Sequence, residues 1–492
     1  MKVLLVNPPW KKAEGVFGVR AGSRWPFTVP AASAAALPYV PFPFFLAYAA
    51  ALLERESGLT VSAIDAIAEG LEERAYLDRV AAFAPDVILA ETATASWTED
   101  ARLARAVKEL APEARLFLAG PHVSSFADKA LASVLEVEAC LVGEYEWTLR
   151  DLIRVLREHD RVPEDMPGLA VRDGSGGVRV NPRRALGDLD ELPWPAWHHF
   201  PMLNYKDYFC SFPRPMVNMV ASRGCPFRCN FCLWPEVMYG GHAYRVRQMS
   251  DVVDEMAALV TRYGFKTFYF DDDTFNIGKA RLLEFASLVR ARKLDVSLAV
   301  MARADTMDAE TLAALKAAGL HAIKYGVESG SQRVLDLAGK SLDLATVRRT
   351  VADTKALGVK VHLTFTVGLR GETLESLRQT RELALELAPD SLQLSYATPF
   401  PGTRYHKYAR ENGFLLTDDE TLFDGAQGCV VRTEDLEATE VEAGFHAFRA
   451  AWEDFRKNGG TKGNAQIPPQ TCSQPLATVR SQGQQTRVPN QV

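Results

Sequence analysis

The chain has 492 residues, a formal net charge of −6, and a composition that is 47% hydrophobic and 24% charged. This length exceeds the ~250–300 residues at which one hydrophobic core stops growing, so at least two domains are expected. The ordinary composition excludes a disordered or collagen-like chain, and the acidic balance argues against a nucleic-acid binder, which usually carries a basic domain. Seven cysteines in so long a chain exclude a disulfide-dense scaffold.

The start of the chain has the features of a cytoplasmic protein. The apolar run Val3–Val6 is too short for a secretory signal, and an Asn-Pro-Pro sequence follows it at once. Residues 26–53 contain no charged side chain, which suggests either a membrane-facing segment or a loop followed by a buried helix. Prolines interrupt this segment as far as residue 43, and a bilayer span needs ~20 residues of nearly unbroken helix. We therefore expect a buried helix and no transmembrane segment.

Residues 1–150 alternate short β-branched runs with helical stretches, which predicts an α/β domain with a doubly wound parallel sheet of the Rossmann-like type. The strands lack polar–apolar alternation, as is typical of strands covered on both faces. The expected strands are Lys2–Asn7, Thr60–Asp65, Asp86–Glu91, Arg115–Ala119 and Glu136–Val142, and the expected helices are Phe44–Arg55, Glu69–Phe83, Thr98–Leu110 and Ser125–Val134.

Residues 151–215 form a Pro- and Gly-rich connector, in which Ala170–Arg172 and Val178–Val180 are candidates for a small hairpin. Residues 216–410 contain six further strand–helix units, which favours a partial (βα)6 barrel over a full eight-unit one. Its expected strands are Met216–Ser222, Lys266–Phe270, Ser297–Met301, Ala322–Val327, Lys360–Val367 and Ser391–Ala397, and its expected helices are Asp251–Tyr263, Lys279–Arg292, Ala309–Ala318, Thr346–Leu357 and Thr373–Leu387.

The two last segments differ in composition. Residues 411–457 are expected to form a small helical cap. Residues 458–492 are rich in Gln, Pro, Gly and Thr and contain no acidic or aromatic residue. Such a segment buries too little apolar area to offset the cost of ordering it, so a disordered tail is expected.

The strongest motif is Cys225-Pro-Phe-Arg-Cys229-Asn-Phe-Cys232, which follows the first strand of the second α/β unit. Spacings of three and two residues allow three thiolates to converge on one small object. A structural zinc site commonly has four ligands in two Cys-x2-Cys pairs, and the sequence has no second pair. Three thiolates suit a 4Fe–4S cluster with one iron open to another ligand, which points to chemistry, because clusters that only transfer electrons are normally fully ligated by cysteine.

Polar groups follow every expected strand of the barrel. A βα barrel places its site at the carboxyl ends of its strands. Any one such group can be a helix cap, but six on one rim indicate a ligand site, in which carboxylates bind hydroxyl or ammonium groups, arginine binds a carboxylate, and glycines allow close backbone approach. After the cysteines of the first strand come Asp271–Asp273, Arg303–Asp305, Glu328–Gly330, Gly368–Glu372 and Thr398–Thr403.

The cysteine motif resembles the radical S-adenosylmethionine (radical SAM) family, including its aromatic residue before the last cysteine. In that family the open iron binds the amino and carboxylate groups of SAM, and one electron releases a 5′-deoxyadenosyl radical that abstracts hydrogen from an unreactive C–H bond. The Asp triplet stands where many members carry Gly-Gly-Glu. The resemblance implies that Cys225, Cys229 and Cys232 bind the cluster, and that SAM contacts Phe231, Asp271, Asp272, Asp273, Arg303, Glu328, Ser329 and Gly368.

The strand ends of the first domain contain neither a Gly-x-Gly-x-x-Gly nor a Gly-x-x-x-x-Gly-Lys-Ser/Thr motif, so dinucleotide and nucleoside-triphosphate binding are poor interpretations. The segments Val-Asn-Pro-Pro, Ala-Gly-Pro-His-Val and Val-Gly-Glu-Tyr-Glu are similar to the cobalamin-binding domain of cobalamin-dependent radical SAM enzymes, and the combined resemblance covers residues 1–455 approximately. It implies cobalamin contacts at Asn7, Pro8, Pro9, Asp65, Thr92, Gly120, Pro121, His122, Gly143 and Glu144.

The Asp-x-His-x-x-Gly pattern that supplies an axial histidine in other cobalamin proteins is absent. His122 is the only histidine on the expected rim, and a neutral histidine more often packs or forms hydrogen bonds than binds a metal. Our hypothesis is that cobalt lacks a protein histidine below it, which would ease methyl transfer to a carbon radical.

The resemblance implies an enzyme that methylates an unactivated carbon of a small-molecule or natural-product intermediate, with a reductant such as flavodoxin or ferredoxin as partner. The alternative with the same cofactors is rearrangement, ring contraction or oxidative cyclisation, because residues 231–245 look like members that act on hopanoid-linked sugars. A third hypothesis is a non-catalytic iron–sulfur redox sensor. The apolar segment before residue 53 would suit a lipid-like substrate. The expected organisation is a cobalamin-binding domain (1–150), a connector (151–215), a radical SAM barrel (216–410), a helical cap (411–457) and a tail (458–492).

Overall fold

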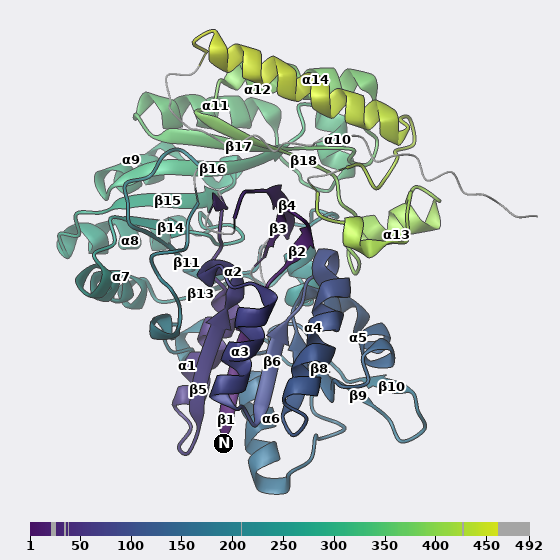
Figure 1. Cartoon of the computed structure of the whole chain (residues 1–492). Helices are drawn as coiled ribbons and strands as arrows, with labels where there is room; N and C mark the ends of the chain where they lie inside the picture. The colour runs from purple at the N-terminus through teal and green to yellow at the C-terminus, as the bar shows by residue number, and fades with distance from the viewer. Residues whose placement is uncertain (21–25, 34–35, 38, 208, 426–427, 461–492) are drawn as a thin grey trace, which may run out of the picture.

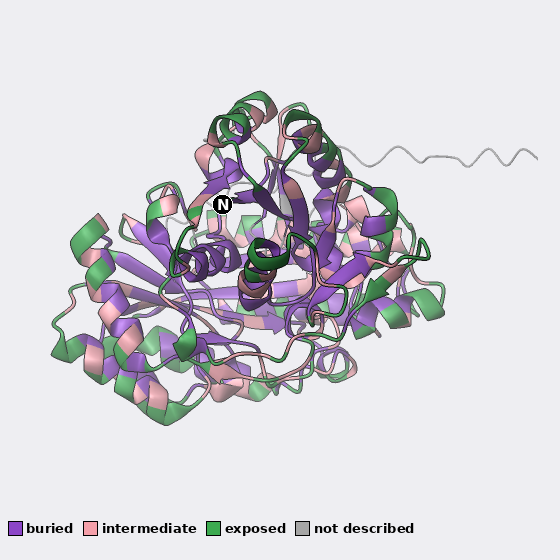
Figure 2. Ribbon diagram, turned by 90° about the horizontal axis from the view of Figure 1, so that it is seen from below, coloured by how far each residue is buried: buried purple, intermediate pink, exposed green. Residues whose placement is uncertain are grey.

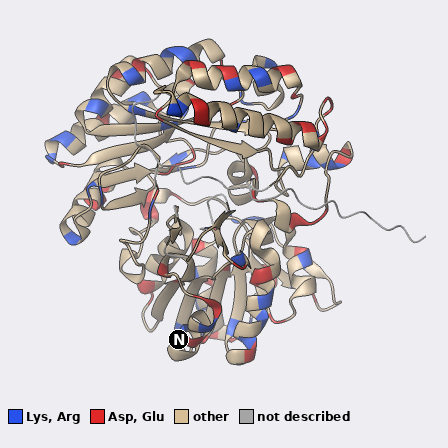
Figure 3. Cartoon of the chain, turned by 45° about the horizontal axis from the view of Figure 1, so that its top comes forward, with Lys and Arg blue, Asp and Glu red and all other residues tan. Residues whose placement is uncertain are grey.

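The computed structural model describes residues 1–20, 26–33, 36–37, 39–207, 209–425 and 428–460. Two sheets dominate these residues, and helices cover their outer faces (Figure 1). The strands are largely buried, whereas the outward sides of the helices are exposed and carry most of the charged side chains (Figures 2 and 3). Residues 461–492 of the expected tail lie outside the described residues.

The first sheet has seven strands in the order β10–β9–β8–β7–β6–β1–β5. The strands from β8 to β5 run parallel, which confirms the doubly wound sheet. The hairpin expected in the connector forms β9 and β10, and it extends this sheet through antiparallel pairing with β8. The bounds are β1 Lys2–Asn7, β5 Thr60–Asp65, β6 Val87–Glu91, β7 Arg115–Ala119, β8 Ala139–Leu141, β9 Leu169–Arg172 and β10 Val178–Val180.

Helices cover both faces of the first sheet because its strands are apolar on both sides. Val3 and Leu5 of β1 face the core beneath α1 and α6, and Leu4 and Val6 face the core beneath α3, α4 and α5. The bounds are α1 Phe44–Glu54, α2 Ala66–Glu69, α3 Glu73–Phe83, α4 Trp97–Leu110, α5 Pro121–Ser133 and α6 Glu146–His159.

Helix α1 is buried from Phe44 to Leu53, which confirms the predicted buried helix. A helix that is apolar on all sides is stable only where it is covered on all sides. The first sheet covers one side of α1, and the connector and the second unit cover the other. The Phe42 ring, just before the helix, lies 4.6 Å from the Trp197 ring, and Arg247 donates a hydrogen bond to the Tyr48 hydroxyl at 3.4 Å. Among the described residues, no helix is long and apolar enough to cross a membrane.

A small antiparallel sheet stands where the sequence indicated only loop. It consists of β2 (Lys11–Ala13), β3 (Val16–Val19) and β4 (Phe27–Pro30), and it lies between the two large sheets in Figure 1. Strands of three or four residues have too little alternation to be recognised from the sequence. The Lys12 ammonium lies 3.2 Å from the Asp424 carboxylate, so this sheet links the start of the chain to the segment before α14.

The second sheet has six parallel strands in the order β11–β14–β15–β16–β17–β18, which confirms the partial βα barrel. The expected first strand, Met216–Ser222, is divided in two: β11 stays in the sheet, and β12 leaves it to pair with β13. This departure carries the chain into the cysteine motif. The bounds are β11 Met216–Met219, β12 Ser222–Arg223, β13 Arg245–Val246, β14 Thr267–Phe270, β15 Ser297–Ala302, β16 Leu320–Glu328, β17 Lys360–Val367 and β18 Ser391–Tyr396.

The helices of the second unit cover the outer face of its sheet. The long helix α14 packs over α12, and the Phe448 ring lies 5.6 Å from the Phe365 ring of β17. Within the expected cap, the described helices are α14 and the 3-10 turn Glu420–Leu422. The bounds are α7 Met249–Tyr263, α8 Lys279–Ala291, α9 Ala309–Ala317, α10 Gln332–Leu337, α11 Leu344–Ala356, α12 Leu374–Leu387, α13 Arg404–Glu411 and α14 Ala438–Lys457.

Candidate functional site

The cysteine motif forms a loop between β12 and a π-helical turn at Trp234–Met238. The loop begins at Gly224, whose φ is +89° and whose backbone is so close to the Ala243 carbonyl that a Cβ would lie 1.9 Å from the oxygen. Only glycine fits such a position. The Gly224 N–H donates to the Asp273 carboxylate at 2.9 Å, and the Asn230 side chain donates to the Leu337 carbonyl at 3.0 Å. Both ends of the loop are therefore fixed to the barrel.

The three cysteine sulfurs are spread more widely than the ligands of one metal ion. Zinc binds sulfur at ~2.3 Å, so two sulfurs on one zinc lie less than ~4.6 Å apart. Among the described residues, Glu54, His198 and His199 form a trio whose ligand atoms all lie within 4.8 Å of one another. The three cysteines of the motif do not form such a trio. The sulfurs are thus not arranged around a single zinc ion, and the 4Fe–4S cluster follows from the motif.

Burial sets the electrostatics of the cysteine loop. Burial and the charges of the other two cysteines raise the pKa of the Cys232 thiol well above its usual value, and burial raises the pKa of Cys225. Cys229 is buried. Buried thiols of this kind lose their protons to a metal rather than to water, so the loop is suited to holding a cationic cluster.

The Asp triplet lies directly beside the cysteine loop. Asp272 accepts hydrogen bonds from the Ala221 N–H at 3.0 Å and from the Ser222 hydroxyl, and burial raises its pKa to about 6. Asp273 accepts the Gly224 N–H, and Asp271 is buried between them and β14. Two of the three predicted SAM contacts therefore also fix the strand that carries the cysteines.

Arg303, at the end of β15, contacts the cysteine loop from the other side. Its guanidinium lies 3.6 Å from the centre of the Phe227 ring, which is a cation–π contact. The same group pairs with Asp305 at 2.9 and 2.7 Å and donates to the Lys340 carbonyl at 2.9 Å. The predicted carboxylate-binding arginine is therefore already paired with a carboxylate of this chain.

The ends of β16 and β17 lie next to each other and include further predicted SAM contacts. Glu328 has φ +73°, which is unusual for a residue other than glycine and marks a functional or constrained position. Its carboxylate accepts hydrogen bonds from Lys340 at 3.0 Å and Thr366 at 2.9 Å. Ser329 lies 3.2 Å from the Thr380 hydroxyl, facing α12, and the predicted aromatic contact Phe231 packs in an apolar cluster with Leu369 and Tyr405.

Gly368 is tied to the buried carboxyl group of Glu372, which was expected among the polar strand ends but not among the SAM contacts. The Gly368 N–H donates to Glu372, and burial raises the pKa of Glu372 to about 8. The other carboxyl oxygen of Glu372 has no hydrogen-bond partner among the described residues.

The rim of the first sheet gathers most of the predicted cobalamin contacts. Asn7 donates to Asp65 at 2.9 Å, Asp65 accepts the Tyr205 hydroxyl at 2.9 Å, and burial raises the Asp65 pKa to about 6. Thr92 donates to the Ala119 carbonyl at 2.8 Å, and Gly120, with φ +102°, lies so close to Thr92 that a Cβ would meet its carbonyl oxygen at 2.4 Å. Pro8 and Thr92 line a small cavity beneath this rim, Pro9 is half-buried beside it, and Pro121 begins α5.

His122 is a buried, neutral histidine at this rim. Its ring stacks on the Trp97 ring at 4.2 Å and lies 5.5 Å from the Phe126 ring, and burial lowers its pKa to about 3. Both ring nitrogens lack a hydrogen-bond partner among the described residues. The position allows either packing or coordination by an unprotonated nitrogen.

Glu144 joins the two rims. Its carboxylate pairs with Arg245 of β13 and lies 3.5 Å from Arg223 of β12, and Arg223 pairs with Glu146 at 2.7 Å. All four side chains are at most 15% exposed. Gly143 completes the contact, because a Cβ there would lie 2.9 Å from the Met238 carbonyl.

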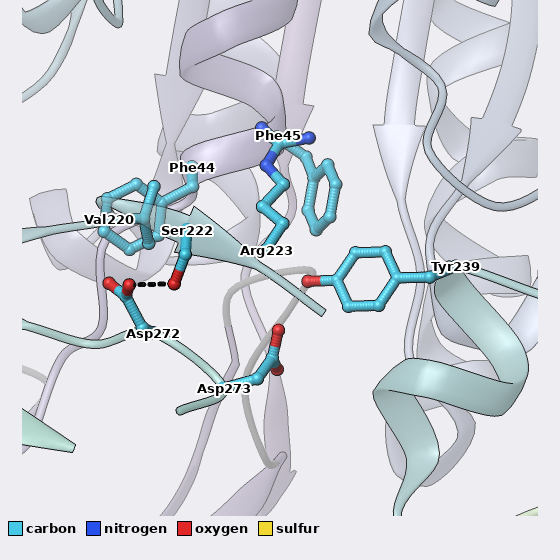
Figure 4. A pocket seen from close by; sticks show the side chains of 8 residues that line it. All are labelled: Phe44, Phe45, Val220, Ser222, Arg223, Tyr239, Asp272 and Asp273. Atoms are coloured by element: carbon cyan, nitrogen blue, oxygen red, sulfur yellow. Dashed lines mark hydrogen bonds between the residues drawn. The ribbon is translucent and has the colours of Figure 1, made fainter. Parts of the chain in front are cut away.

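A small cavity lies at this junction. It is lined by α1, β12, two residues of the Asp triplet (Asp272 and Asp273) and the turn after the cysteines. Figure 4 shows Arg223 directed away from the Ser222–Asp272 pair towards Phe45. A second contact joins the rims farther along, where the Ser125 hydroxyl donates to the Pro401 carbonyl at 3.0 Å. The structure thus brings the predicted cluster loop and the predicted cobalamin rim together, although their sequences are about one hundred residues apart.

Sequence analysis did not find the pairing of Arg223 and Arg245 with Glu144 and Glu146, because each is an ordinary charged residue until its distant partner is known. It also missed polar residues on the inward face of the barrel strands. Their only signal is alternation in Lys360–Val367 and Ser391–Tyr396, where every second residue is polar.

Comparison with known proteins identifies close relatives of the chain. Residues 219–384 match the model of the radical SAM superfamily. An uncharacterized methyltransferase, PH0819 of Pyrococcus horikoshii, is 30% identical over 85% of both chains. Cytidylyl-2-hydroxyethylphosphonate methyltransferase of Streptomyces wedmorensis is 28% identical over 79% of this chain and 81% of its own length. Anaerobic magnesium-protoporphyrin IX monomethyl ester cyclase of Rubrivivax gelatinosus is 26% identical over 82% and 68%.

Two solved structures share the fold. The radical SAM methyltransferase TsrM of Kitasatospora setae, solved with cobalamin and a [4Fe-4S] cluster, aligns with a TM-score of 0.64 at 19% identity over 84% of this chain and 75% of that one. The cobalamin-dependent radical SAM enzyme OxsB, solved with aqua-cobalamin and S-adenosylmethionine, aligns with a TM-score of 0.69 at 17% identity over 93% and 67%. These likenesses extend over both sheets.

Proposed function

The chain belongs to the cobalamin-dependent radical SAM enzymes, and from that membership we propose that it methylates an unactivated carbon of a small molecule. Its cofactors are a 4Fe–4S cluster, SAM and cobalamin; when bound, SAM supplies the radical and the methyl group, and cobalamin carries the methyl group. One observation supports this proposal above all others. The cysteine loop and the rim of the first sheet meet through the buried Arg223, Glu144 and Glu146.

The residues of the chain have distinct parts in this proposal. Cys225, Cys229 and Cys232 hold the cluster, and Gly224 and Asp273 fix the position of their loop. The proposed SAM contacts are Phe231, Asp271, Asp272, Arg303, Glu328, Ser329 and Gly368. Those whose side chains already have partners within the chain would shape the site or would exchange a partner for SAM.

The first rim provides the proposed cobalamin site. Asn7, Pro8, Pro9, Asp65, Thr92, Gly120, Pro121, Gly143 and Glu144 lie along it. His122 stands beside them, and we propose that it packs between Trp97 and Phe126 and leaves cobalt without a protein imidazole. The burial of this rim excludes water, which protects reactive species from side reactions.

The activities named for the relatives support one further candidate function. The Rubrivivax gelatinosus relative is a cyclase, whereas PH0819 and the Streptomyces wedmorensis protein are methyltransferases. A cyclisation or rearrangement by the same cofactors would use the same cysteine loop and differ only in the fate of the substrate radical. Methylation is the better supported candidate because it is the activity named for PH0819 and the Streptomyces wedmorensis protein, which are 30% and 28% identical, against 26% for the cyclase.

Product analysis tests the proposal. The full chain is reconstituted anaerobically with iron, sulfide, cobalamin and reductant, then incubated with SAM and a metabolite extract, and the small products are measured by mass spectrometry. Formation of both S-adenosylhomocysteine and 5′-deoxyadenosine, dependent on the extract, is expected for methylation. Formation of 5′-deoxyadenosine alone would favour rearrangement or cyclisation. Formation of neither product would favour a redox sensor and contradict the proposal.

We propose that a flavodoxin or ferredoxin of the cytoplasm supplies the electron. The lipid-like substrate stays a prediction, and the segment that suggested it gives it no support. The apolar side chains of helix α1 pack in the core: Phe44, Phe45 and the residues up to Leu53 are all buried. The chemistry of the substrate must therefore be sought in other residues.

A further inference from the structure

The barrel strands have a polar inward face that no step above uses. On β16 and β17, Tyr325 and Phe365 point outward to the helices, because the Tyr325 hydroxyl lies 3.0 Å from Thr354 of α11 and the Phe365 ring contacts Phe448 of α14. Successive residues of a strand point to opposite sides. Lys324 and Thr364 therefore face inward.

Pairing between the strands extends this face across the sheet. Lys324 lies beside His362, which lies beside Ser391, and Thr364 lies beside Gln393. The residues that point to the helices are buried, whereas Lys324, Thr364, Thr366, Gln393 and Ser395 are only partly buried. Half-exposed polar side chains in the middle of central strands indicate a face that is open to a ligand.

Aromatic residues close the lower end of this face. The Phe209 ring lies 5.2 Å from the His362 ring and 4.9 Å from the Tyr269 ring, and Phe212 packs against Phe209 at 4.7 Å. The Lys324 ammonium lies 5.7 Å from the Phe209 ring. A ligand would therefore enter from the carboxyl ends of the strands and stop at Lys324.

The charge on Lys324 is not compensated. Its ammonium donates to the Gln393 amide oxygen at 3.3 Å, and no carboxylate of the described residues lies within 4.0 Å of it. Two other lysines that reach these strands have carboxylate partners: Lys340, which lies between α10 and α11, has Glu328 at 3.0 Å, and Lys360 of β17 has Asp390 at 2.7 Å. A cation without a counter-ion in a half-buried place favours binding of an anion.

Unused hydrogen-bonding groups lie next to this cation. His362 is 4% exposed; its Nδ1 lies 2.8 Å from the Ser391 hydroxyl, and its Nε2 has no partner among the described residues. Farther along the sheet, on β11, which β14 and β15 separate from β16, Asn218 is fully buried, and neither of its amide atoms has a partner among the described residues. Buried polar atoms without partners are rare and commonly mark the place of a missing ligand or water.

We propose that Lys324, Gln393 and Ser395 bind an anionic group of the substrate, a carboxylate or a phosphoryl group, on the inward face of the barrel. The inference rests on the proposed function, since it assigns the lower end of the same site. The Lys324 ammonium supplies the charge, and the Gln393 amide and the Ser395 hydroxyl, which lie 3.3 Å apart, supply hydrogen bonds.

The position distinguishes this group from the carboxylate of SAM. Lys324 precedes Glu328 by four residues of β16, so at ~3.3 Å per residue their Cα atoms lie about 13 Å apart, and the Glu328 carboxylate reaches back as far as the Thr364 hydroxyl at 3.3 Å. The cysteine loop and the proposed SAM contacts are at the Glu328 level or above it. Lys324 donates to Gln393, whereas Glu328 accepts from Lys340, so the proposed anion site and the proposed SAM contact have different partners. We assign the anion to a second molecule, and the SAM-binding control below tests this distinction.

Binding of small probes to the full chain tests the proposal without any cofactor. Methylphosphonate and acetate represent the phosphoryl and carboxylate classes, and isothermal titration at low ionic strength measures each. At least one probe is expected to bind with a Kd in about the millimolar range, as befits so small a ligand. Lys324→Gln should weaken that binding at least tenfold, Gln393→Leu should weaken it about threefold or more, and Lys324→Arg should largely retain it. The probe that binds more tightly shows whether the anionic group of the substrate is a phosphoryl group or a carboxylate.

Two controls make the result decisive. Lys360→Gln removes the same charge from a lysine that is already paired, and it should leave probe binding unchanged. SAM binding, measured by equilibrium dialysis on the reconstituted enzyme, should be unchanged in Lys324→Gln. The proposal is overturned if neither probe binds, if Lys324→Gln binds as tightly as the native chain, or if the variant loses SAM instead. Absence of SAM cleavage would contradict the proposed function and leave the probe result standing.

Discussion

Single residues at the site differ sharply in whether they hold a proton, and Glu372 is the clearest case. Its carboxyl group is buried beside Gly368, with a pKa raised from 4.5 to about 8. In the unfolded chain the same group ionises near pH 4.5. The folded state therefore retains a proton that the unfolded state loses, so the free energy of unfolding falls as the pH rises from about 4.5 to about 8.

Replacement of Glu372 by glutamine tests the predicted fall in the free energy of unfolding with rising pH. Glu372→Gln keeps the hydrogen bond to the Gly368 N–H and cannot ionise, so it should remove a loss of stability on the order of a few kcal/mol between pH 5 and pH 8.5. The measurement is the midpoint of thermal unfolding at both pH values. Glu382→Gln, an exposed replacement on α12, serves as the control and should follow the native chain. An equal decrease in the Glu372→Gln and native midpoints would contradict the assignment.

His122 is the residue on which the coordination of cobalt depends. If its ring only packs between Trp97 and Phe126, the paramagnetic resonance spectrum of bound cob(II)alamin should lack nitrogen splitting from the protein, and His122→Ala should leave the spectrum unaltered. The variant should lower stability through the lost packing instead. A nitrogen splitting that disappears in His122→Ala would show that the unpaired ring nitrogen binds cobalt and would refute the hypothesis.

At the scale of elements, β12 is the strand that joins the two halves of the site. Arg223 on this strand is 4% exposed and pairs with Glu146, which begins α6 and is fully buried. Its guanidinium also lies 4.6 Å from the Phe45 ring of α1. One short strand thus contacts two helices of the first domain and leads directly into the cysteines.

Breaking the Arg223–Glu146 pair should lower the free energy of unfolding strongly, because the Glu146 carboxylate stays buried without its partner. Arg223→Met should destabilise the chain by about 3–5 kcal/mol, and the double replacement Arg223→Met with Glu146→Gln should recover much of that loss. Thermal unfolding of the single and double variants measures both effects. Arg378→Met, which removes two exposed ion pairs on α12, serves as the control and should be far less destabilising. If Arg223→Met proves as mild as Arg378→Met, the joining role of β12 is wrong.

The elements that the sequence predicted well are those with long periodic patterns or a constrained end. Helix α1 and the strands β1 and β5 through β8 follow from apolar runs bounded by turn residues, and the cysteine motif follows from spacing alone. The sheet of β2 to β4 did not, because its strands are too short. Glu144 was predicted to contact cobalamin and Arg223 received no predicted role, because nothing local records that residues 79 positions apart will lie together.

At the scale of the whole molecule, the order of the chain explains the site. Two α/β units each present the carboxyl ends of their strands, and the chain folds so that these ends face each other across Glu144, Arg223 and Arg245. The polar inward face around Lys324 then lies below the cysteine loop.

The central claim is that three cysteines hold a cluster with one iron free for SAM. The most direct measurement is the paramagnetic resonance spectrum of the reduced, anaerobically reconstituted chain, recorded with and without SAM. The native spectrum should change when SAM is added, Cys229→Ala should lose the cluster signal, and Cys429→Ala, a replacement outside the loop, should behave as the native chain. A native spectrum that is identical with and without SAM would contradict the account.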